Sequence, residues 1–141
     1  MVAHPKPRVL LAARPVARKP FHAALGDDAE IVEAEALDEA VRHLTRPEEP
    51  KLVCCTVYFD ESRMFDLLRW IRSQRSHIPV ICARAVPKDI TKISMEAVKI
   101  AADVLGASSF IDVAAIAERE GEQVALRRLR ELLLTQLPAA S

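Results

Sequence analysis

Five short apolar runs alternate with stretches of helical periodicity, and this alternation limits the possible folds more than any other feature of the sequence. The runs are RVLLAA (8–13), AEIVEAE (29–35), KLVCCTVYF (51–59), IPVICARA (78–85) and SSFIDV (108–113). Residues 51–59 form a continuous apolar run, which is typical of a strand buried on both faces of a parallel sheet. Strands that alternate with helices pair in parallel through right-handed crossovers, with helices on both faces. The sequence therefore predicts an α/β, doubly wound five-stranded parallel sheet.

The segments between these runs are expected to be helices. The predicted helices are one that ends at Gly26, one over 37–45, one that follows residues 51–59, one over 88–106 that ends at Gly106, and one over 120–137. Apolar spacing assigns a buried side to the last three. The residues predicted on those buried sides are Phe65, Leu67, Leu68 and Ile71, then Ile93, Ala97, Ile100 and Val104, and then Val124, Leu129, Leu132 and Leu133. Asp66, Arg69 and Arg72 are expected to reach water.

Length and charge exclude several classes of protein. The 141 residues suit one domain, predicted over 8–134, with loose ends at 1–7 and 135–141. Twenty basic residues balance twenty acidic ones, which argues against nucleic acid or a membrane surface as the partner. No apolar run approaches the roughly 18 residues needed to span a bilayer, and no signal-peptide core is evident. We therefore expect a cytoplasmic protein.

The three cysteines are predicted to be reduced and buried. Cys54, Cys55 and Cys82 all lie in apolar runs, and their odd number and spacing suit neither a disulfide framework nor a zinc site. Cys54 and Cys82 are expected to lie level on neighbouring strands. A redox pair there is conceivable, but directly adjacent parallel strands rarely give relaxed disulfide geometry, so core packing is favoured.

Three segments, in their order and spacing, resemble parts of a response-regulator receiver domain. PKLVCCTVYFDESRMFDLLRWIR (50–72) is similar to the third strand, active-site loop and third helix of that family, IPVICARA to the fourth strand, and LGASSFI (105–111) to the passage into the fifth. The resemblance covers about residues 8–134. It implies a flavodoxin-like (CheY-like) fold with sheet order 2-1-3-4-5.

The positions that carry the family's chemistry have been replaced. The acidic pair that helps to hold Mg²⁺ in receivers falls within Ala12, Ala13 and Arg14, so the oxygen ligands that this ion requires are missing. The phosphate-accepting aspartate maps to Thr56, a neutral hydroxyl without a nearby base. The resemblance therefore implies no catalytic residue, no metal and no cofactor at these positions.

Two further positions of the family motif also depart from it. The serine or threonine at the end of the fourth strand maps to Arg84, and the lysine at the end of the fifth maps to Val113 or its neighbour Asp112. The chain thus resembles an atypical, aspartate-less receiver, or pseudoreceiver. The resemblance implies a non-catalytic regulatory module that is independent of phosphorylation and acts by protein–protein contact.

Several alternatives remain open at the strand ends. Asp60 and Asp66 are either displaced phosphorylation sites or, as we favour, a loop residue that caps the following helix and a helix-surface residue. Arg14, Thr56 and Arg84 could hold a phosphate or carboxylate, which would make the chain a sensor of small anionic ligands. The simpler alternative is an internal ion pair from Arg84 to Asp112 or Asp60.

Two length differences from the family pattern point to the partner surface. The stretch between Ala85 and Gly106 is longer than a receiver's fourth helix needs, and AAIAEREGE (114–122) lengthens the approach to the last helix. In the family, helix four, strand five and helix five commonly mediate dimerisation and output. The resemblance thus implies another signalling protein, or a second copy of the chain, as the partner of this face.

Overall fold

The computed structural model describes residues 6–86 and 92–137, which form one five-stranded parallel sheet. The strands, in chain order, are β1 (Arg8–Ala12), β2 (Glu30–Ala34), β3 (Leu52–Thr56), β4 (Val80–Arg84) and β5 (Ser109–Asp112). They are arranged in the order β2-β1-β3-β4-β5, and every pairing is parallel. The predicted doubly wound fold and its strand order are confirmed.

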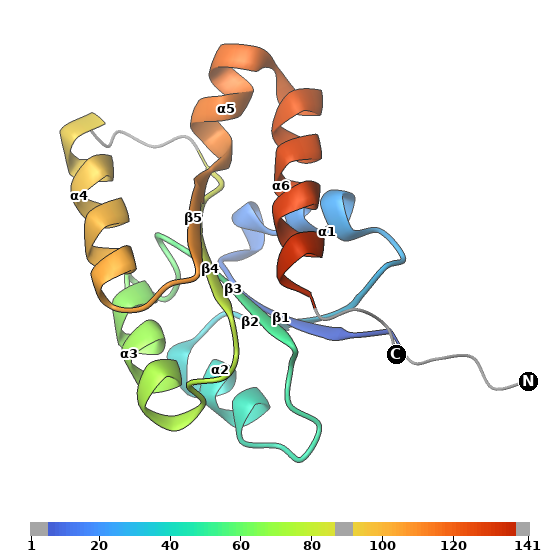
Figure 1. Ribbon diagram of the computed structural model, residues 1–141, viewed down its shortest axis with the longest axis vertical. Coiled ribbons are helices and arrows are strands. Elements are labelled where there is room, and N and C mark those ends of the chain that lie inside the picture. The colour runs from blue at the N-terminus through green and yellow to red at the C-terminus, as the bar shows by residue number, and fades with distance from the viewer. Residues whose placement is uncertain (1–5, 87–91, 138–141) are drawn as a thin grey trace, which may run out of the picture.

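Helices cover both faces of this sheet (Figure 1). The helical elements are η1 (Pro15–Ala17), α1 (Lys19–Leu25), α2 (Leu37–Leu44), α3 (Met64–Gln74), α4 (Lys92–Val104), α5 (Val113–Glu120) and α6 (Glu122–Gln136). Helices α1 and α6 lie on one face, α2, α3 and α4 lie on the other, and α5 continues upward from β5 beyond the carboxyl ends of the strands. No helix among the described residues is long and apolar enough to cross a membrane.

The central strand β3 is buried along its whole length, as its apolar run predicts. Successive side chains of a strand point to opposite faces, so β3 contributes to two separate cores. Leu52 and Cys54 pack with α1 and α6, whereas Val53 and Cys55 pack with α2, α3 and α4. Burial on both faces fixes the position of β3, and with it the position of the residues at its carboxyl end.

The buried side of α4 differs from the prediction. Ala97 is exposed, Ile100 is 60% exposed and Val104 is 78% exposed, whereas Met95 and Ala102 are buried. The side chain of Ile93 and residues 88–91 lie outside the described part of the chain. The helix has apolar residues on two sides, so periodicity alone could not decide which side faces the sheet.

Two further features correct the sequence-based interpretation. Residues 113–120 form the helix α5, which packs against α6 and was not predicted, because three of its eight residues are charged and its apolar spacing is short. Arg72 does not point to open water. Its guanidinium donates hydrogen bonds to the carbonyl oxygens of Gly106 (2.7 Å), Ser76 (2.7 Å) and Ile78 (2.9 Å), and it thereby fixes the turn between α4 and β5.

Candidate functional site

The carboxyl ends of β1, β3, β4 and β5 bring the predicted site positions to one edge of the sheet. Thr56 lies opposite Ala83, and Arg84 lies opposite Asp112. Arg84 is therefore one residue beyond the partner of Thr56 in the β3–β4 register. For the same reason Cys82 pairs with Cys55, not with Cys54 as expected from the sequence.

Arg84 and Asp112 form an ion pair across the β4–β5 edge. The Arg84 Nε donates to Asp112 Oδ1 at 2.9 Å, and the two side chains are only 11% and 23% exposed. The same oxygen accepts a hydrogen bond from the backbone N–H of Ala115 at 3.0 Å, so Asp112 is also the N-cap of α5. The internal ion pair proposed from the sequence is therefore present, and Val113, the other candidate at this position, is buried as the first residue of α5.

Thr56 occupies the position at the end of β3 and is only 3% exposed. Its carbonyl accepts a hydrogen bond from the N–H of Phe59, and the N–H of the next residue, Val57, bonds to the carbonyl of Ala83. Its Oγ1 has no hydrogen-bond partner among the described residues. A buried neutral hydroxyl without an adjacent base lacks the chemistry of a phosphate acceptor.

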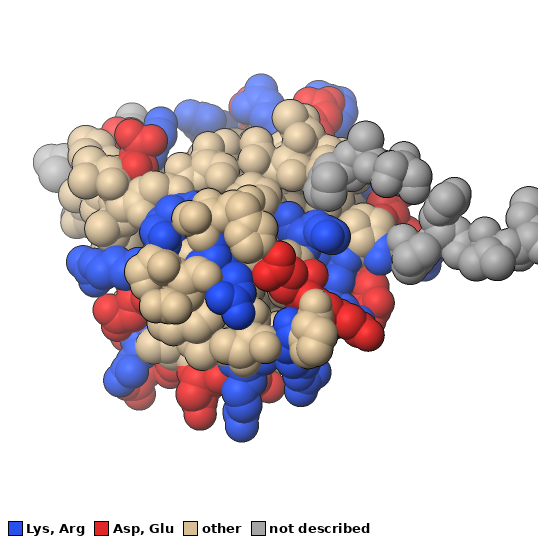
Figure 2. Space-filling model, turned by 60° about the horizontal axis from the view of Figure 1, so that its bottom comes forward, with Lys and Arg blue, Asp and Glu red and all other residues tan. Residues whose placement is uncertain are grey.

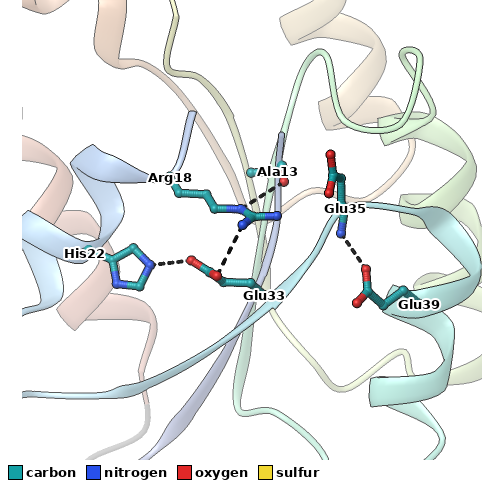
Figure 3. A network of polar contacts seen from close by, with 6 residues as sticks. All are labelled: Ala13, Arg18, His22, Glu33, Glu35 and Glu39. Carbon is teal, nitrogen blue, oxygen red and sulfur yellow. Dashed lines mark hydrogen bonds and ion pairs between the residues drawn. The ribbon is translucent and has the colours of Figure 1, made fainter. Parts of the chain in front are cut away.

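Polar side chains beside the end of β1 are already paired with one another (Figure 3). Arg18 donates to the carbonyl of Ala13 at 3.4 Å and to Glu33 Oε1 at 3.3 Å. The other oxygen of Glu33 lies 2.6 Å from His22 Nε2. Glu33 lies on β2, next to β1, but its carboxylate contacts side chains of α1 and of the residue that precedes this helix. No local sequence pattern predicts this contact, because Glu33 and Arg18 belong to different elements.

The donor set at these positions does not fit Mg²⁺. This ion takes oxygen ligands, above all carboxylates, whereas Ala12 and Ala13 are fully buried methyl groups and Arg14 is a half-buried cation. No group of three or more potential metal-ligating side chains occurs in residues 6–86 and 92–137. The geometry supports no metal-dependent step at this edge.

The loop between β3 and α3 is held by Asp60, although not as predicted. Its Oδ2 accepts the backbone N–H of Leu37 at 2.7 Å, so Asp60 caps α2 and not the helix that follows it. Asp60, Glu61 and Ser62 all have left-handed φ angles of 44°, 55° and 68°. Each costs about 1–2 kcal/mol in a residue with a Cβ, and the buried Phe59 and the Asp60 bond offset that cost.

Asp66 lies in the first turn of α3, where it is exposed and 3.4 Å from Arg69. This agrees with a surface position on the helix. Its use as a displaced phosphorylation site stays a prediction.

The cysteines are packed as small apolar residues. All three are free and buried, and Cys54 lies in a different core from Cys55 and Cys82. Burial raises the pKa of Cys82 to about 12 and raises the pKa of Cys54 and Cys55 as well. The reactive form of cysteine is the thiolate, so these thiols are chemically quiet in the folded protein.

Helix α4 carries two strongly exposed large apolar side chains, Ile100 and Val104. Beside them, a hollow of about 320 Å³ between α4 and β5 is lined by three apolar residues, Ile100, Ala107 and Phe110, and by four polar ones, Glu96, Lys99, Asp103 and Ser109. Elsewhere the surface is mixed in charge, and Figure 2 shows basic and acidic residues interspersed on one face. That face carries no broad basic patch of the kind that nucleic acids require.

Structures of response-regulator receivers share this fold. The phosphorylated cyanobacterial phytochrome response regulator RcpA has a TM-score of 0.70 and 18% identity, over 95% of this chain and 99% of that one. A response regulator from Thermotoga maritima has a TM-score of 0.68 and 20% identity, over 93% of this chain and 97% of that one. The orphan response regulator HP1043 of H. pylori has a TM-score of 0.66 and 17% identity, over 95% of this chain and 100% of that one. Identities this low establish the fold and not the activity.

No family model and no curated protein sequence matches the chain. Function therefore has to be argued from the site and the surface.

Proposed function

We propose that the chain is a cytoplasmic, non-catalytic module of the pseudoreceiver type, which regulates by protein–protein contact independently of phosphorylation. The observation that carries this proposal is the Arg84–Asp112 ion pair, in which two positions of the receiver motif satisfy each other at 2.9 Å. The Nε of Arg84 is already engaged by Asp112, and the negative charge of Asp112 opposes the binding of an anionic phosphoryl group beside it. The burial of Thr56 and the absence of carboxylates at Ala13 and Arg14 support the same proposal.

The partner is another signalling protein or a second copy of the chain, and α4 with β5 is its contact surface. An exposed apolar stripe costs free energy in water and is covered when a partner binds. Ile100 and Val104 are the two most strongly exposed large apolar side chains of α4, and the neighbouring hollow offers a recess for a partner side chain. Nucleic acid and membrane are not proposed as partners.

Intact-protein mass spectrometry after incubation with Mg²⁺ and acetyl phosphate tests the loss of phosphoryl chemistry. We expect no adduct of phosphoryl mass, while an ordinary receiver treated in parallel gains one. An adduct on this chain would contradict the proposal, and peptide mapping would then decide between Asp60 and Asp66 as the acceptor.

Analytical ultracentrifugation tests the contact surface. If the partner is a second copy, Val104→Glu should convert a concentration-dependent dimer into a monomer, because it places a charge in an apolar contact. Val16→Glu is a matched control, since Val16 is 60% exposed on η1, away from α4. If the wild type is a monomer at every concentration, the same pair of variants is compared for capture of a partner. A partner that binds both variants equally well would contradict this choice of surface.

A second candidate function is a sensor of small anionic ligands that uses Arg14, Thr56 and Arg84. The observation in its favour is the buried Oγ1 of Thr56, a donor without a described partner at the sheet edge where such folds bind ligands. Titration with inorganic phosphate and nucleotides, followed by amide NMR, tests it. Binding that is lost in Arg14→Gln and in Arg84→Ala supports the sensor, whereas binding unchanged by both substitutions contradicts it.

A further inference from the structure

A second apolar hollow, of about 520 Å³, lies between α1, α5 and α6 on the side of the molecule away from α4. Five of its eleven lining residues are alanines, which come from α1, the end of β4, α5 and α6: Ala23, Ala85, Ala114, Ala117 and Ala125. Pro20, Val113 and Leu126 complete its apolar part. We call this hollow the alanine groove. Its volume lies within the range of about 300–1,000 Å³ that is typical of small-molecule sites.

The groove lies where α5 places the short side chains of Ala114 and Ala117 beside residues of α1 and α6. Helix α5 stands beyond the sheet and packs against α6, and Arg128 of α6 clamps Glu120 of α5 with two hydrogen bonds of 2.8 and 2.9 Å. Protein interiors are otherwise packed with few voids larger than a water molecule. A leucine at Ala117 would reach into this space, whereas the alanine leaves it open to an incoming apolar group.

The rim of the groove is charged and carries more negative than positive groups. Glu118 and Glu122 line one part of it and Lys19 another, and all three side chains are exposed. Within residues 6–86 and 92–137 none of these three forms an ion pair with another residue, whereas the neighbouring Glu120 is held by Arg128. An apolar floor with a net negative rim matches an apolar molecule that carries one positive charge.

We propose that the alanine groove binds a small apolar amine, with its hydrocarbon body on the alanine methyl groups and its ammonium group near Glu118 and Glu122. A ligand bound in the groove would also lie next to the ion pair at the sheet edge. Ala85 and Val113 line the groove, and they directly follow Arg84 and Asp112, which form the ion pair at the sheet edge. The site stands on its own contacts and does not depend on the function proposed above.

Methyl NMR of the full chain with ¹³C-labelled alanine tests the proposal directly, because five alanines line the groove. The probes are a matched set with one ring system: 1-naphthylmethylamine, 1-naphthylmethanol and 1-naphthoate. We expect the amine to shift the five groove methyls and to leave exposed Ala97 and buried Ala34 unchanged. It should bind more tightly than the carboxylate by about two- to thirtyfold at low salt, given the modest worth of exposed charges, with the alcohol between them.

Substitutions at the rim test the contribution of charge to binding, and a substitution on the floor tests the contribution of the groove's shape. The double variant Glu118→Gln, Glu122→Gln leaves only Lys19 and should reverse the preference, so that 1-naphthoate binds more tightly than the amine. Glu131→Gln, at another exposed glutamate of α6, is the control and should leave the preference as it is. Ala117→Leu should abolish the groove shifts for all three probes, whereas Ala97→Leu should not. Urea unfolding of each variant shows that it is folded.

Three outcomes would overturn the proposal. The first is a set of groove methyls that no probe shifts at millimolar concentration, which would leave the groove to a partner helix or to plain imperfect packing. The second is equal affinity for the amine, the alcohol and the carboxylate. The third is an amine preference that survives the double glutamine substitution. Each of these readouts is independent of phosphoryl transfer and of partner binding through α4.

Discussion

The carboxyl edge of the sheet and the outer face of α4 have opposite characters. At the sheet edge, polar side chains satisfy one another: Arg84 pairs with Asp112, and Arg18 and His22 pair with Glu33. On α4, the large apolar side chains of Ile100 and Val104 face water without cover. Apart from the Thr56 hydroxyl, the polar groups named at the edge have partners within the chain, whereas the apolar side chains on α4 lie uncovered.

This difference is the basis for the proposed contact surface on α4. A pocket that binds a charged ligand keeps polar groups free for it, and internal ion pairs remove that freedom. An uncovered apolar face has the opposite property, because its free energy falls when a partner buries it. In this chain ion pairs within the molecule hold the carboxyl edge of the sheet, and exposed large apolar side chains lie on α4.

The strongest test of that contrast removes Asp112. Asp112→Ala should lower the free energy of unfolding by about 2–4 kcal/mol, because it leaves the poorly exposed Arg84 without its partner and α5 without its cap. Urea denaturation measures the change. Asp66→Ala is the matched control, since the Asp66–Arg69 pair is exposed at 3.4 Å, and it should cost no more than about 0.5 kcal/mol. Equal losses in the two variants would show that the sheet edge is no more closed than the surface.

A smaller loss is expected when the support of α4 is removed. Arg72→Met should lower the free energy of unfolding by about 2–3 kcal/mol, because three backbone carbonyls lose their donor while the apolar stem of the side chain is kept. Arg69→Met, on the exposed side of the same helix, should have almost no effect. Hydrogen exchange at residues 105–109 reports the loosened turn. Unchanged protection there would show that α4 is positioned without the Arg72 clamp.

The sequence predicts the fold well because the sheet depends on the apolar runs. The central run, residues 51–59, is long enough to require burial on both faces, and the alternation around it leaves few topologies. The sidedness of α4 was harder to predict. Ala97, Ile100 and Val104 follow helical spacing as closely as buried residues do, and only the packed structure distinguishes an inward stripe from an exposed one.

Side-chain contacts at the site were only partly predictable. The pairing of Arg84 with Asp112 could be proposed, because both residues end neighbouring strands and have opposite charges. The cap that Asp60 provides to α2, and the bond from Arg18 to Glu33, join segments 23 and 15 residues apart whose relative positions no local pattern specifies. The register of β3 and β4 was misjudged by one residue, because continuous apolar runs carry no marker of alignment.

A substitution at Thr56 is expected to raise the free energy of unfolding, whereas the two substitutions above lower it. Its Oγ1 is buried without a described partner, so Thr56→Val should raise the free energy of unfolding by about 1 kcal/mol. The substitution keeps the β-branched shape that suits a strand. Thr45→Val is the control, because the Thr45 hydroxyl is exposed and donates to the carbonyl of Arg42 at 3.0 Å. Destabilisation by Thr56→Val would mean that the hydroxyl already has a partner in the folded chain, which would weaken the case for the anion-sensor function.

The mildest effect is expected at the amino edge of the sheet, where a titratable group is partly buried among cations. Burial, followed by the charge of Arg46, lowers the pKa of His43 below its ordinary value of 6.5, and Arg8 and Arg42 act in the same direction against the opposing Glu39. Because the unfolded chain then binds the proton more readily, His43 should lower the stability as the pH falls below about 6.5 and should have no such effect above it.

The test compares urea unfolding of the wild type and His43→Gln between pH 7.5 and 5.5. The wild type should lose more stability over this range, and Arg46→Gln should lie between the two because it removes one cause of the shift. An NMR titration of the His43 ring measures independently whether its pKa in the folded protein is lowered. A folded-state pKa above 6.5 would mean that Glu39 outweighs the surrounding arginines, and the amino edge would then resemble the closed carboxyl edge, with its charge neutralised inside the chain.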